Sequence, residues 1–473
     1  MPRTKAWLGL KDLCARYGGI IYLNVLGTHI VVVGSPSVAS QLLEKRSANT
    51  SDRPSSAVLP LTGNDVALSI MPYGQWWRDH RRAFWQVFHP DAAREYRETH
   101  RAITHKFLSK LVDSPQDFKQ HIRYIFSAAS MKVLYDIDAK DEGDELMSKI
   151  GEALSCTSDV ATGGHPVDLL PFLRHIPGWV PGFGFQYALA SCKAAVTYMK
   201  EAPFAQLKSA LDEGRAAPCA LSVLLSRINE AAGTKEFAYQ EDVVKNVGLV
   251  AFEGGSDTSY GTLQGLFLAL SLYPEVQKKA QAELDAIVGP DRLPDFDDRD
   301  ALVYVRAVIK EALRWHVVVP LGIPHRTLKD DVLDGYLIPA GTVIVPNTWA
   351  MLQDPEAYDR PEEFKPERYF RDGNLDPTVR DPYDYAFGFG RRQESMSCAG
   401  KHFAEDALYL SIASVLHVFN IQPPLDEQGR PIKIKHQQTH GLLSYPKDCR
   451  CVVKPRSAEA VALIAEAVHT RAE

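Results

Sequence analysis

The sequence predicts a mainly α-helical domain with small β-sheets near its two ends. The longest helical pattern covers residues 240–273 and ends before Pro274. Helical patterns also cover most of 92–160 and 185–235, whereas the β-rich runs lie at 20–33 and 332–345. We find no internal repeat, low-complexity tract or linker, so the whole chain, 1–473, is expected to fold as a single domain.

Composition excludes several classes of protein. The net charge is −6, which argues against a nucleic-acid partner. The seven cysteines are scattered and odd in number, with no signal peptide before them. That usage predicts a reduced chain and not a disulfide framework. No apolar run reaches the ~18 residues of a spanning helix, so this chain is not expected to cross a membrane itself.

The first third begins with predicted strands around Gly27, which form a hairpin over 20–33. Ser35 then starts a helix that continues to about Arg46. Residues 54–71 are short apolar pieces broken by proline and glycine, and are expected to form a loop.

A cationic helix follows this loop. Trp77 and Arg81 are four residues apart, so they share one helix face. Such a face suits a flat, anionic, partly apolar ligand, although the same charges on a surface would simply be solvated.

Segment 169–183, which begins at Leu169 and ends at Phe183, is apolar but broken by prolines. It is either a buried connection or a loop that touches a membrane surface. Burial is the interpretation adopted here.

The helix over 240–273 would span roughly 45–50 Å and belongs in the core. Its middle contains Gly254 and Gly255, and each costs about 1 kcal/mol relative to alanine in a helix interior. Either another element packs against the bare backbone, or a bulky ligand lies there. The neighbouring Asp257 and Thr258 favour a ligand, because buried polar groups need partners.

A further helix is predicted over 302–315. Glu311 and Arg314 lie three residues apart on it and can pair, which is usually a surface interaction of small value. The proline-rich segment 354–370 then contains Arg368.

Near the C-terminal end, a glycine- and arginine-rich loop starts at Phe387, and Cys398 stands before another helical run. Helix N-terminal amides and guanidinium groups favour the thiolate over the thiol. Such a cysteine can be a nucleophile, a redox thiol or a metal ligand, or it can have no role.

Together these motifs resemble the haem-thiolate monooxygenases, the cytochromes P-450, over nearly the whole chain. The closest likeness is to eukaryotic microsomal, particularly fungal, members. Five motifs occur in the family's order: Trp77-x-x-x-Arg81, Gly254-Gly255-x-Asp257-Thr258, Glu311-x-x-Arg314, Pro366-Glu367-Arg368, and Phe387-x-x-Gly390-x-Arg392 before Cys398-x-Gly400. Each is weak alone, but all five in order make coincidence very improbable.

The resemblance implies the cytochrome P-450 fold, with a long central helix over haem b, and Cys398 as the axial thiolate of its iron. Phe387 would shield that thiolate, and the two glycines would admit oxygen and substrate. Asp257 and Thr258 would relay protons. The haem propionates would be held by Trp77, Arg81, Arg326 and Arg392.

The resemblance also implies that Glu311, Arg314 and Arg368 form a buried charge network behind the haem. By family position, the substrate would be lined by residues 59–71, Phe252, Val318, Val319, Leu442 and Leu443.

The reaction implied is insertion of one oxygen atom from O2 into an apolar small molecule, a secondary metabolite or xenobiotic. Electrons would come from NADPH through a cytochrome reductase, with Arg391 and Lys401 as contacts. The family places such proteins as monomers on the cytosolic side of the endoplasmic reticulum membrane. Segment 169–183 would offer a peripheral contact.

Two departures from the family stand out. The N-terminal anchor of microsomal members is absent from this sequence. The family has one residue between its arginine and the cysteine, whereas segment 393–397, from Gln393 to Ser397, places five there. The extra residues could bulge outward and leave Cys398 in place, or they could displace its sulfur. They could also reflect a misplaced exon boundary, which is the explanation that we favour.

Two alternatives to monooxygenation follow. In the first, the insertion at 393–397 would make the chain a catalytically impaired or non-catalytic haem-binding relative. In the second, the chain would be a haem-thiolate isomerase or dehydratase. The second ranks lower, because such members often lose the acid–threonine pair that Asp257 and Thr258 provide.

Overall fold

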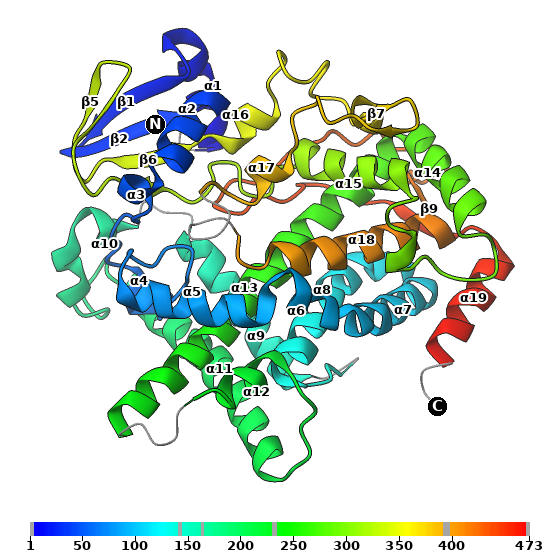
Figure 1. Ribbon diagram of the computed structural model, residues 1–473, viewed down its shortest axis with the longest axis horizontal. Coiled ribbons are helices and arrows are strands. Elements are labelled where there is room, and N and C mark those ends of the chain that lie inside the picture. The colour runs from blue at the N-terminus through cyan, green and yellow to red at the C-terminus, as the bar shows by residue number, and fades with distance from the viewer. Residues whose placement is uncertain (1–3, 141–143, 162–164, 229–233, 391–397, 470–473) are drawn as a thin grey trace.

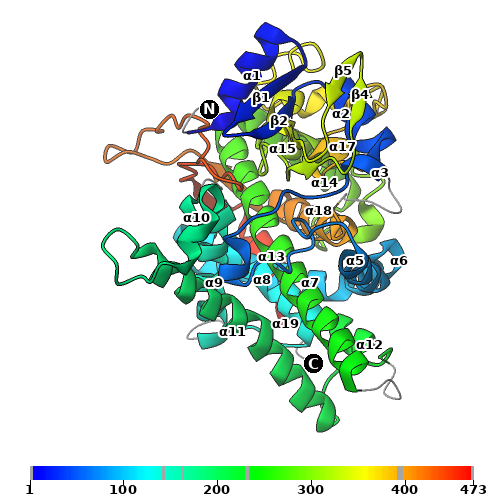
Figure 2. The same ribbon diagram turned by 90° about the vertical axis from the view of Figure 1, so that its left-hand side faces the viewer.

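Helix α13 (Thr234–Leu272) crosses the molecule, and many of the other helices pack around it (Figures 1 and 2). The computed structural model describes residues 4–140, 144–161, 165–228, 234–390 and 398–469. At 39 residues and ~1.5 Å per residue, α13 spans roughly 58 Å. It begins earlier than the predicted residue 240 and ends one residue before the predicted end. The predicted mainly α-helical class is confirmed.

The elements before α13 are mostly helical. The helices in this part of the chain are α1 (Ala6–Tyr17), α2 (Pro36–Ala39), the π-helix η1 (Ser40–Lys45), α3 (Ser47–Thr50), α4 (Leu59–Thr62), α5 (Gln75–Phe88), α6 (Pro90–Glu95), α7 (Arg97–Asp113), η2 (Pro115–Asp117), α8 (Phe118–Tyr135), α9 (Glu145–Ala161), α10 (Pro166–Leu169), η3 (Pro171–His175), α11 (Phe185–Asp212) and α12 (Ala220–Leu225).

After α13, helices alternate with short strands. The helices are α14 (Pro274–Ile287), η4 (Phe296–Asp298), α15 (Val303–Trp315), α16 (Thr348–Leu352), η5 (Pro366–Tyr369), α17 (Tyr383–Ala386), α18 (Lys401–Val418) and α19 (Ala458–His469). The strands of the whole chain are β1 (Ile20–Val25), β2 (Thr28–Val33), β3 (His325–Arg326), β4 (Asp331–Leu333), β5 (Tyr336–Ile338), β6 (Val343–Pro346), β7 (Phe370–Arg371), β8 (Asn374–Leu375), β9 (Phe419–Gln422) and β10 (Val452–Pro455).

The main sheet joins the two predicted β-rich runs at one side of the molecule (Figure 1). Its strand order is β1-β2-β6-β3; β2 runs parallel to β6, and the other neighbours are antiparallel. The predicted hairpin is confirmed, with Ile20 opposite Val33. Leu26 and Gly27 both have positive φ, 51° and 85°, which matches the tight turns that hairpins prefer.

Helix α13 belongs to two apolar cores. Its N-terminal half contributes Val247 and Phe252 to a core with α5, α8, α9 and α11, whereas its C-terminal half contributes Leu266 and Phe267 to a core with α7, α14, α15 and α18. A helix packed into a core through each of its halves is held as a rigid rod, so the side chains in its middle are fixed in position.

The two glycines in the middle of α13 have different neighbours. A Cβ on Gly254 would meet no heavy atom within 4 Å, whereas one on Gly255 would approach the Ser130 hydroxyl of α8 to 3.3 Å. The interpretation of a packed neighbouring element therefore holds at Gly255, and the ligand interpretation stays a prediction at Gly254. Gly255 accommodates a packed helix, and Gly254 faces open space.

The pair of Glu311 and Arg314 is fully buried, as the family resemblance implied, and is not the routine surface pair that its spacing alone suggests. The Arg314 Nε and Nη2 atoms each donate to the Glu311 carboxylate at 2.8 Å, and both side chains are 0% exposed. Arg368 Nε donates to the same carboxylate at 3.1 Å, and the Lys365 amide at 2.8 Å. One carboxylate therefore links α15 to the chain around η5.

Two other expectations from the sequence are changed by the structure. Cys156 of α9 and Cys192 of α11 form a disulfide, so the expectation of a wholly reduced chain is wrong at this pair. The two helices pack side by side and bring the cysteines together. Segment 169–183 is not buried: Leu169, Phe172 and Trp179 are 58%, 61% and 76% exposed.

Over the part of the chain that the structure describes, we find no helix with the length and apolar character needed to span a membrane.

Replacing Glu311 tests the buried network. Glu311→Gln keeps the shape but leaves Arg314 and Arg368 as buried charges without a counter-ion. We expect it to lower the free energy of unfolding by about 3–5 kcal/mol, measured by denaturant titration. The control Glu275→Gln changes an exposed residue of α14 and should stay within about 0.5 kcal/mol of the parent. Equal stability of the two variants would contradict the buried network.

Candidate active site

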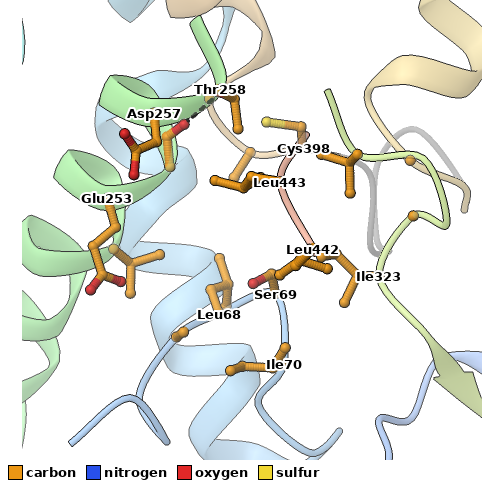
Figure 3. Close-up of a pocket in the computed structure, with 18 of the residues that line it drawn as sticks. Leu68, Ser69, Ile70, Glu253, Asp257, Thr258, Ile323, Cys398, Leu442 and Leu443 are labelled. Atoms are coloured by element: carbon orange, nitrogen blue, oxygen red, sulfur yellow. Dashed lines mark hydrogen bonds between the residues drawn. The ribbon is translucent and has the colours of Figure 1, made fainter. Parts of the chain in front are cut away.

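A large cavity lies between the middle of α13 and the loop that carries Cys398 (Figure 3). Its volume is about 660 Å³, within the range of roughly 300–1,000 Å³ typical of ligand pockets. Its wall is built from segments far apart in sequence: the chain before α5, α5 itself, α8, α13, the chain around β3, and the segments that carry Cys398 and Leu443.

Cys398 presents its sulfur to this cavity. Its amide donates to the carbonyl of Phe387 at 2.8 Å, which joins the two ends of the glycine-rich loop, and α18 begins at Lys401. The side chain is exposed toward the cavity, and Figure 3 shows the sulfur directed at the α13 wall. The surrounding protein raises the pKa of the thiol by desolvation, while the Gly400 amide and the Arg81 guanidinium oppose that rise.

Helix α5 contributes Trp77 and Arg81 to the wall, one turn apart as predicted. Trp77 is 3% exposed and its indole N–H donates to the Leu68 carbonyl at 3.3 Å. Arg81 forms no hydrogen bond or ion pair with the residues that the structure describes. Desolvation lowers its pKa, and the nearby Cys398 partly offsets this effect. A cation held in this way favours an anionic ligand.

A second buried cation, Arg53, was not anticipated from the sequence. It is 3% exposed; its Nη1 donates to the carbonyls of Ile323 and Pro324 at 2.8 and 2.7 Å, while its Nε is buried without a partner. Burial lowers its pKa to about 9, although Asp52 opposes this. The sequence signal was an arginine directly before Pro54, at the start of the predicted loop.

The structure does not bring Arg326 to the cavity. Its guanidinium binds the Asp52 carboxylate, at 2.8 Å from Nε, and it is not one of the described residues that line the wall. His325 lines the wall instead, because neighbouring residues of a strand point to opposite faces. His325 Nδ1 is 2.9 Å from the Thr50 carbonyl, which can only accept, so Nδ1 carries the proton. Burial, with Arg53 adding to it, lowers the pKa of His325 well below its usual value.

The α13 wall carries the predicted polar pair. The Thr258 hydroxyl donates to the Gly254 carbonyl at 2.7 Å (Figure 3). The Asp257 carboxylate accepts from Arg123 of α8 at 2.9 Å and is 5% exposed. Burial raises the pKa of Asp257, and Arg123 opposes that rise. Arg123 itself is 42% exposed on its side chain, so the pair connects the cavity wall to solvent.

The remaining wall is mostly apolar. Of the predicted substrate-lining residues, Val318, Val319, Leu442 and Leu443 line the cavity, as do several residues between 59 and 71. Phe252 does not, because its side chain is packed in the apolar core and is 1% exposed. Its neighbours Ala251 and Glu253 line the cavity in its place.

Comparison with known proteins identifies the family. A family model described as "Cytochrome P450" matches residues 3–450. The chain belongs to the cytochrome P450 family. It is 38% identical over 459 residues to "Cytochrome P450 monooxygenase COX2" of Coprinopsis cinerea, covering 97% of this chain and 86% of the relative. It is 36% identical over 465 residues to "Tryptamine 4-monooxygenase" of Psilocybe cyanescens, covering 97% and 90%.

A third relative, "Cytochrome P450 monooxygenase ARMGADRAFT_974139" of Armillaria gallica, is 37% identical over 452 residues, covering 94% of this chain and 87% of the relative. The predicted resemblance to fungal cytochromes P450 is therefore confirmed, and the protein is a cytochrome P450 monooxygenase, an oxidoreductase.

The cytochrome P450 family carries haem whose iron is bound by a cysteine thiolate. The described residues fit this group. A sulfur faces the cavity, Gly254 leaves open space opposite it, and two guanidinium groups, those of Arg53 and Arg81, lack a carboxylate partner among the described residues. Two unpaired cations match the two propionates of haem b in charge.

Some predicted residues of this P450 lie elsewhere or outside the described ranges. Arg391, Arg392 and segment 393–397 lie outside the described residues. Lys401, predicted to contact the reductase, lies over the rings of Tyr383 and Phe387 at 5.4 and 5.6 Å.

Replacing Arg81 tests its role in holding an anionic group. We expect Arg81→Gln to weaken haem binding by roughly tenfold or more, because a charge-assisted hydrogen bond is lost. The measurement is titration of haem into the haem-free protein, followed by absorbance. The matched control is Arg82→Gln, whose side chain is 69% exposed on the same helix. An equal loss of affinity in both variants would show that Arg81 has no special part.

Proposed function

We propose that this P450 binds haem b through Cys398 and inserts one oxygen atom from O2 into an apolar small organic molecule. NADPH supplies the electrons through a flavoprotein reductase. The observation that carries the proposal is that Cys398 and Thr258 line one and the same cavity (Figure 3). Haem, when bound, supplies the oxygen activation and the electron transfer.

The cavity wall would hold haem mainly through charged side chains. Arg53 and Arg81 would hold the propionates, and Trp77 would contribute to the wall beside them. His325 adds a third contact: a carboxylate next to it opposes the fall in its pKa and favours a ring that donates from both nitrogens. Arg392 remains part of this proposal by family position.

Proton delivery is assigned to Asp257 and Thr258. Arg123 holds one oxygen of Asp257 from the solvent side. The raised pKa of Asp257 lets this carboxyl take up a proton more readily than an exposed aspartate. Rotation of the Thr258 hydroxyl away from the Gly254 carbonyl presents that proton donor to the cavity.

Substrate is oriented by the apolar wall of the cavity, to which Leu68, Ile70, Val318 and Leu443 contribute. Removing such surface from water favours an apolar ligand at about 25 cal/mol per Å². The fungal relatives and this lining together support a secondary metabolite as the substrate class, with a xenobiotic as the other candidate.

Exposed apolar side chains support peripheral attachment to a membrane. Leu169, Leu170, Phe172 and Trp179 project from the segment that includes α10 and η3, and each is more than half exposed. Contiguous exposed apolar surface of this kind marks an interaction site. We propose that a monomer lies on the cytosolic face of the endoplasmic reticulum through this segment.

Replacing Cys398 tests the haem ligand. Cys398→Ala should abolish the thiolate-type absorption band of the reduced, carbon-monoxide-treated protein, because sulfur ligation gives that band. Cys451→Ala, which changes a cysteine away from the cavity, should keep it. A well-folded parent protein that lacked the band would overturn the monooxygenase proposal and favour a non-catalytic relative.

Replacing Thr258 tests proton delivery. Thr258→Ala should keep the absorption band but lower product formation by about 10²-fold, at the lower end of what positioned proton donors contribute. Oxygen should be consumed without matching product. Thr258→Ser, which retains the hydroxyl, should recover much of the coupling, measured as product per O2 consumed. Unchanged coupling in the alanine variant would rule out this role.

A further inference from the structure

Glu253 is an acid of the cavity wall that the mechanism does not use. It lies on α13 four residues before Asp257, so both carboxyl groups face the same side of the helix. It stands five residues before Thr258, which places it roughly 7.5 Å away along the helix axis. Figure 3 shows it in the part of the cavity bounded by Leu68, away from Cys398.

Glu253 has fewer partners than the other cavity acids: the Thr157 side chain hydrogen-bonds its carboxyl group, but one oxygen is left over. Asp257 is paired with Arg123 at 2.9 Å. Asp168 accepts from the Ser56 hydroxyl at 2.9 Å and from two backbone amides. The Glu253 Oε1 is buried without a hydrogen-bond partner, and no lysine or arginine of the described residues forms an ion pair with this side chain. A buried carboxyl oxygen in that state needs a ligand to satisfy it.

The local electrostatics point to a positively charged ligand. Burial raises the pKa of Glu253 to about 8, and the neighbouring Asp257 adds to the rise, while Thr157 opposes it. The strongest neighbouring charge is thus negative. A cation bound here would be attracted by Glu253 and would favour its ionised form.

The surroundings restrict the rest of the ligand. Leu68 and Ile70 lie on this side of the cavity, and Leu442 and Leu443 close it toward Cys398 (Figure 3). The cavity cations, Arg53 and Arg81, belong to the proposed propionate site. A ligand that complements the remaining lining therefore has an apolar body, which contacts these side chains, and one positive group, which pairs with Glu253.

We propose that Glu253 binds the protonated amine of an otherwise apolar substrate and so positions the far end of that molecule beside Thr258. This inference rests on the proposed function, because the reacting end is defined by the haem site. Glu253 is a positioning residue that sets substrate class, and it takes no part in oxygen chemistry. The preferred substrates are arylalkylamines in which the amine lies on the order of 7 Å from the oxidised carbon.

A charged amine fits better than a neutral donor. A hydroxyl group could also donate to Oε1, but its hydrogen bond is roughly half as strong as a charge-assisted one. In the low-dielectric cavity an ammonium–carboxylate pair is strengthened further. The two cases differ in one measurable way: only the amine should depend on the charge of Glu253.

The test is calorimetric binding to the haem-loaded protein. The probes are 2-phenylethylamine, 3-phenylpropylamine and 4-phenylbutylamine, each with the alcohol of the same length. We expect at least one amine to bind about tenfold or more tightly than its alcohol. Glu253→Gln should weaken that amine by about tenfold or more and change the alcohol by less than about threefold.

Two further variants make the result specific. Glu253→Asp keeps the charge and should retain part of the preference for the amine. Glu236→Gln, at the exposed start of α13, should bind every probe like the parent. An absorbance scan in parallel identifies any amine that ligates the haem iron directly, and such a probe is replaced by its N,N-dimethyl form.

The inference is overturned if no amine is preferred over its alcohol, or if Glu253→Gln weakens the amine and the alcohol equally. These outcomes are separable from failure of the proposed function. Binding needs no turnover, so a protein that prefers amines but forms no product would overturn only the monooxygenase proposal. A protein that oxidises substrates without a preference for amines would overturn only the role of Glu253.

Discussion

The candidate site depends on one backbone hydrogen bond, from the Cys398 amide to the Phe387 carbonyl at 2.8 Å. It brings together the two ends of a loop that is longer here than in the family. Phe387 is itself fixed by stacking on Tyr383, with ring centroids 5.5 Å apart. The sulfur therefore takes its position from residues on both sides of the loop. A loop whose two ends are held in this way can change in length without moving the residue at its end.

The second constraint is the distribution of charge around the cavity. Cations without carboxylate partners, Arg53 and Arg81, line the wall together with Cys398, while the acid with an unpartnered oxygen, Glu253, stands roughly 7.5 Å from Thr258 along α13. Leaving charged groups buried without partners lowers stability. The arrangement is understandable if ligands of opposite charge complete both sites, an anionic cofactor at one and a cationic substrate at the other.

The sequence predicted the elements whose signals are local. The hairpin around Gly27 and helix α15 appear where turn residues and helical periodicity placed them. The sequence did not predict which side chains of a strand or helix point into the cavity. Arg326 was assigned to the propionates by family resemblance, but the pairing of β3 with β6 turns its neighbour His325 toward the cavity. Phe252 was assigned to the substrate lining by family position, yet the rotation of α13 buries it and presents Glu253.

Burial was the other property that local patterns did not give. Glu311 and Arg314 looked like an ordinary pair three residues apart, and only Arg368 and the chain around η5, distant in sequence, make them a closed network. The same is true of Arg53, whose Nη1 is bound by carbonyls 270 and 271 residues further along. Both depend on contacts across the fold. The tertiary structure therefore changes most the roles of charged residues that local patterns place in solvent. Burial causes this change, because an ion pair that is weak on the surface becomes a strong requirement for a partner in the interior.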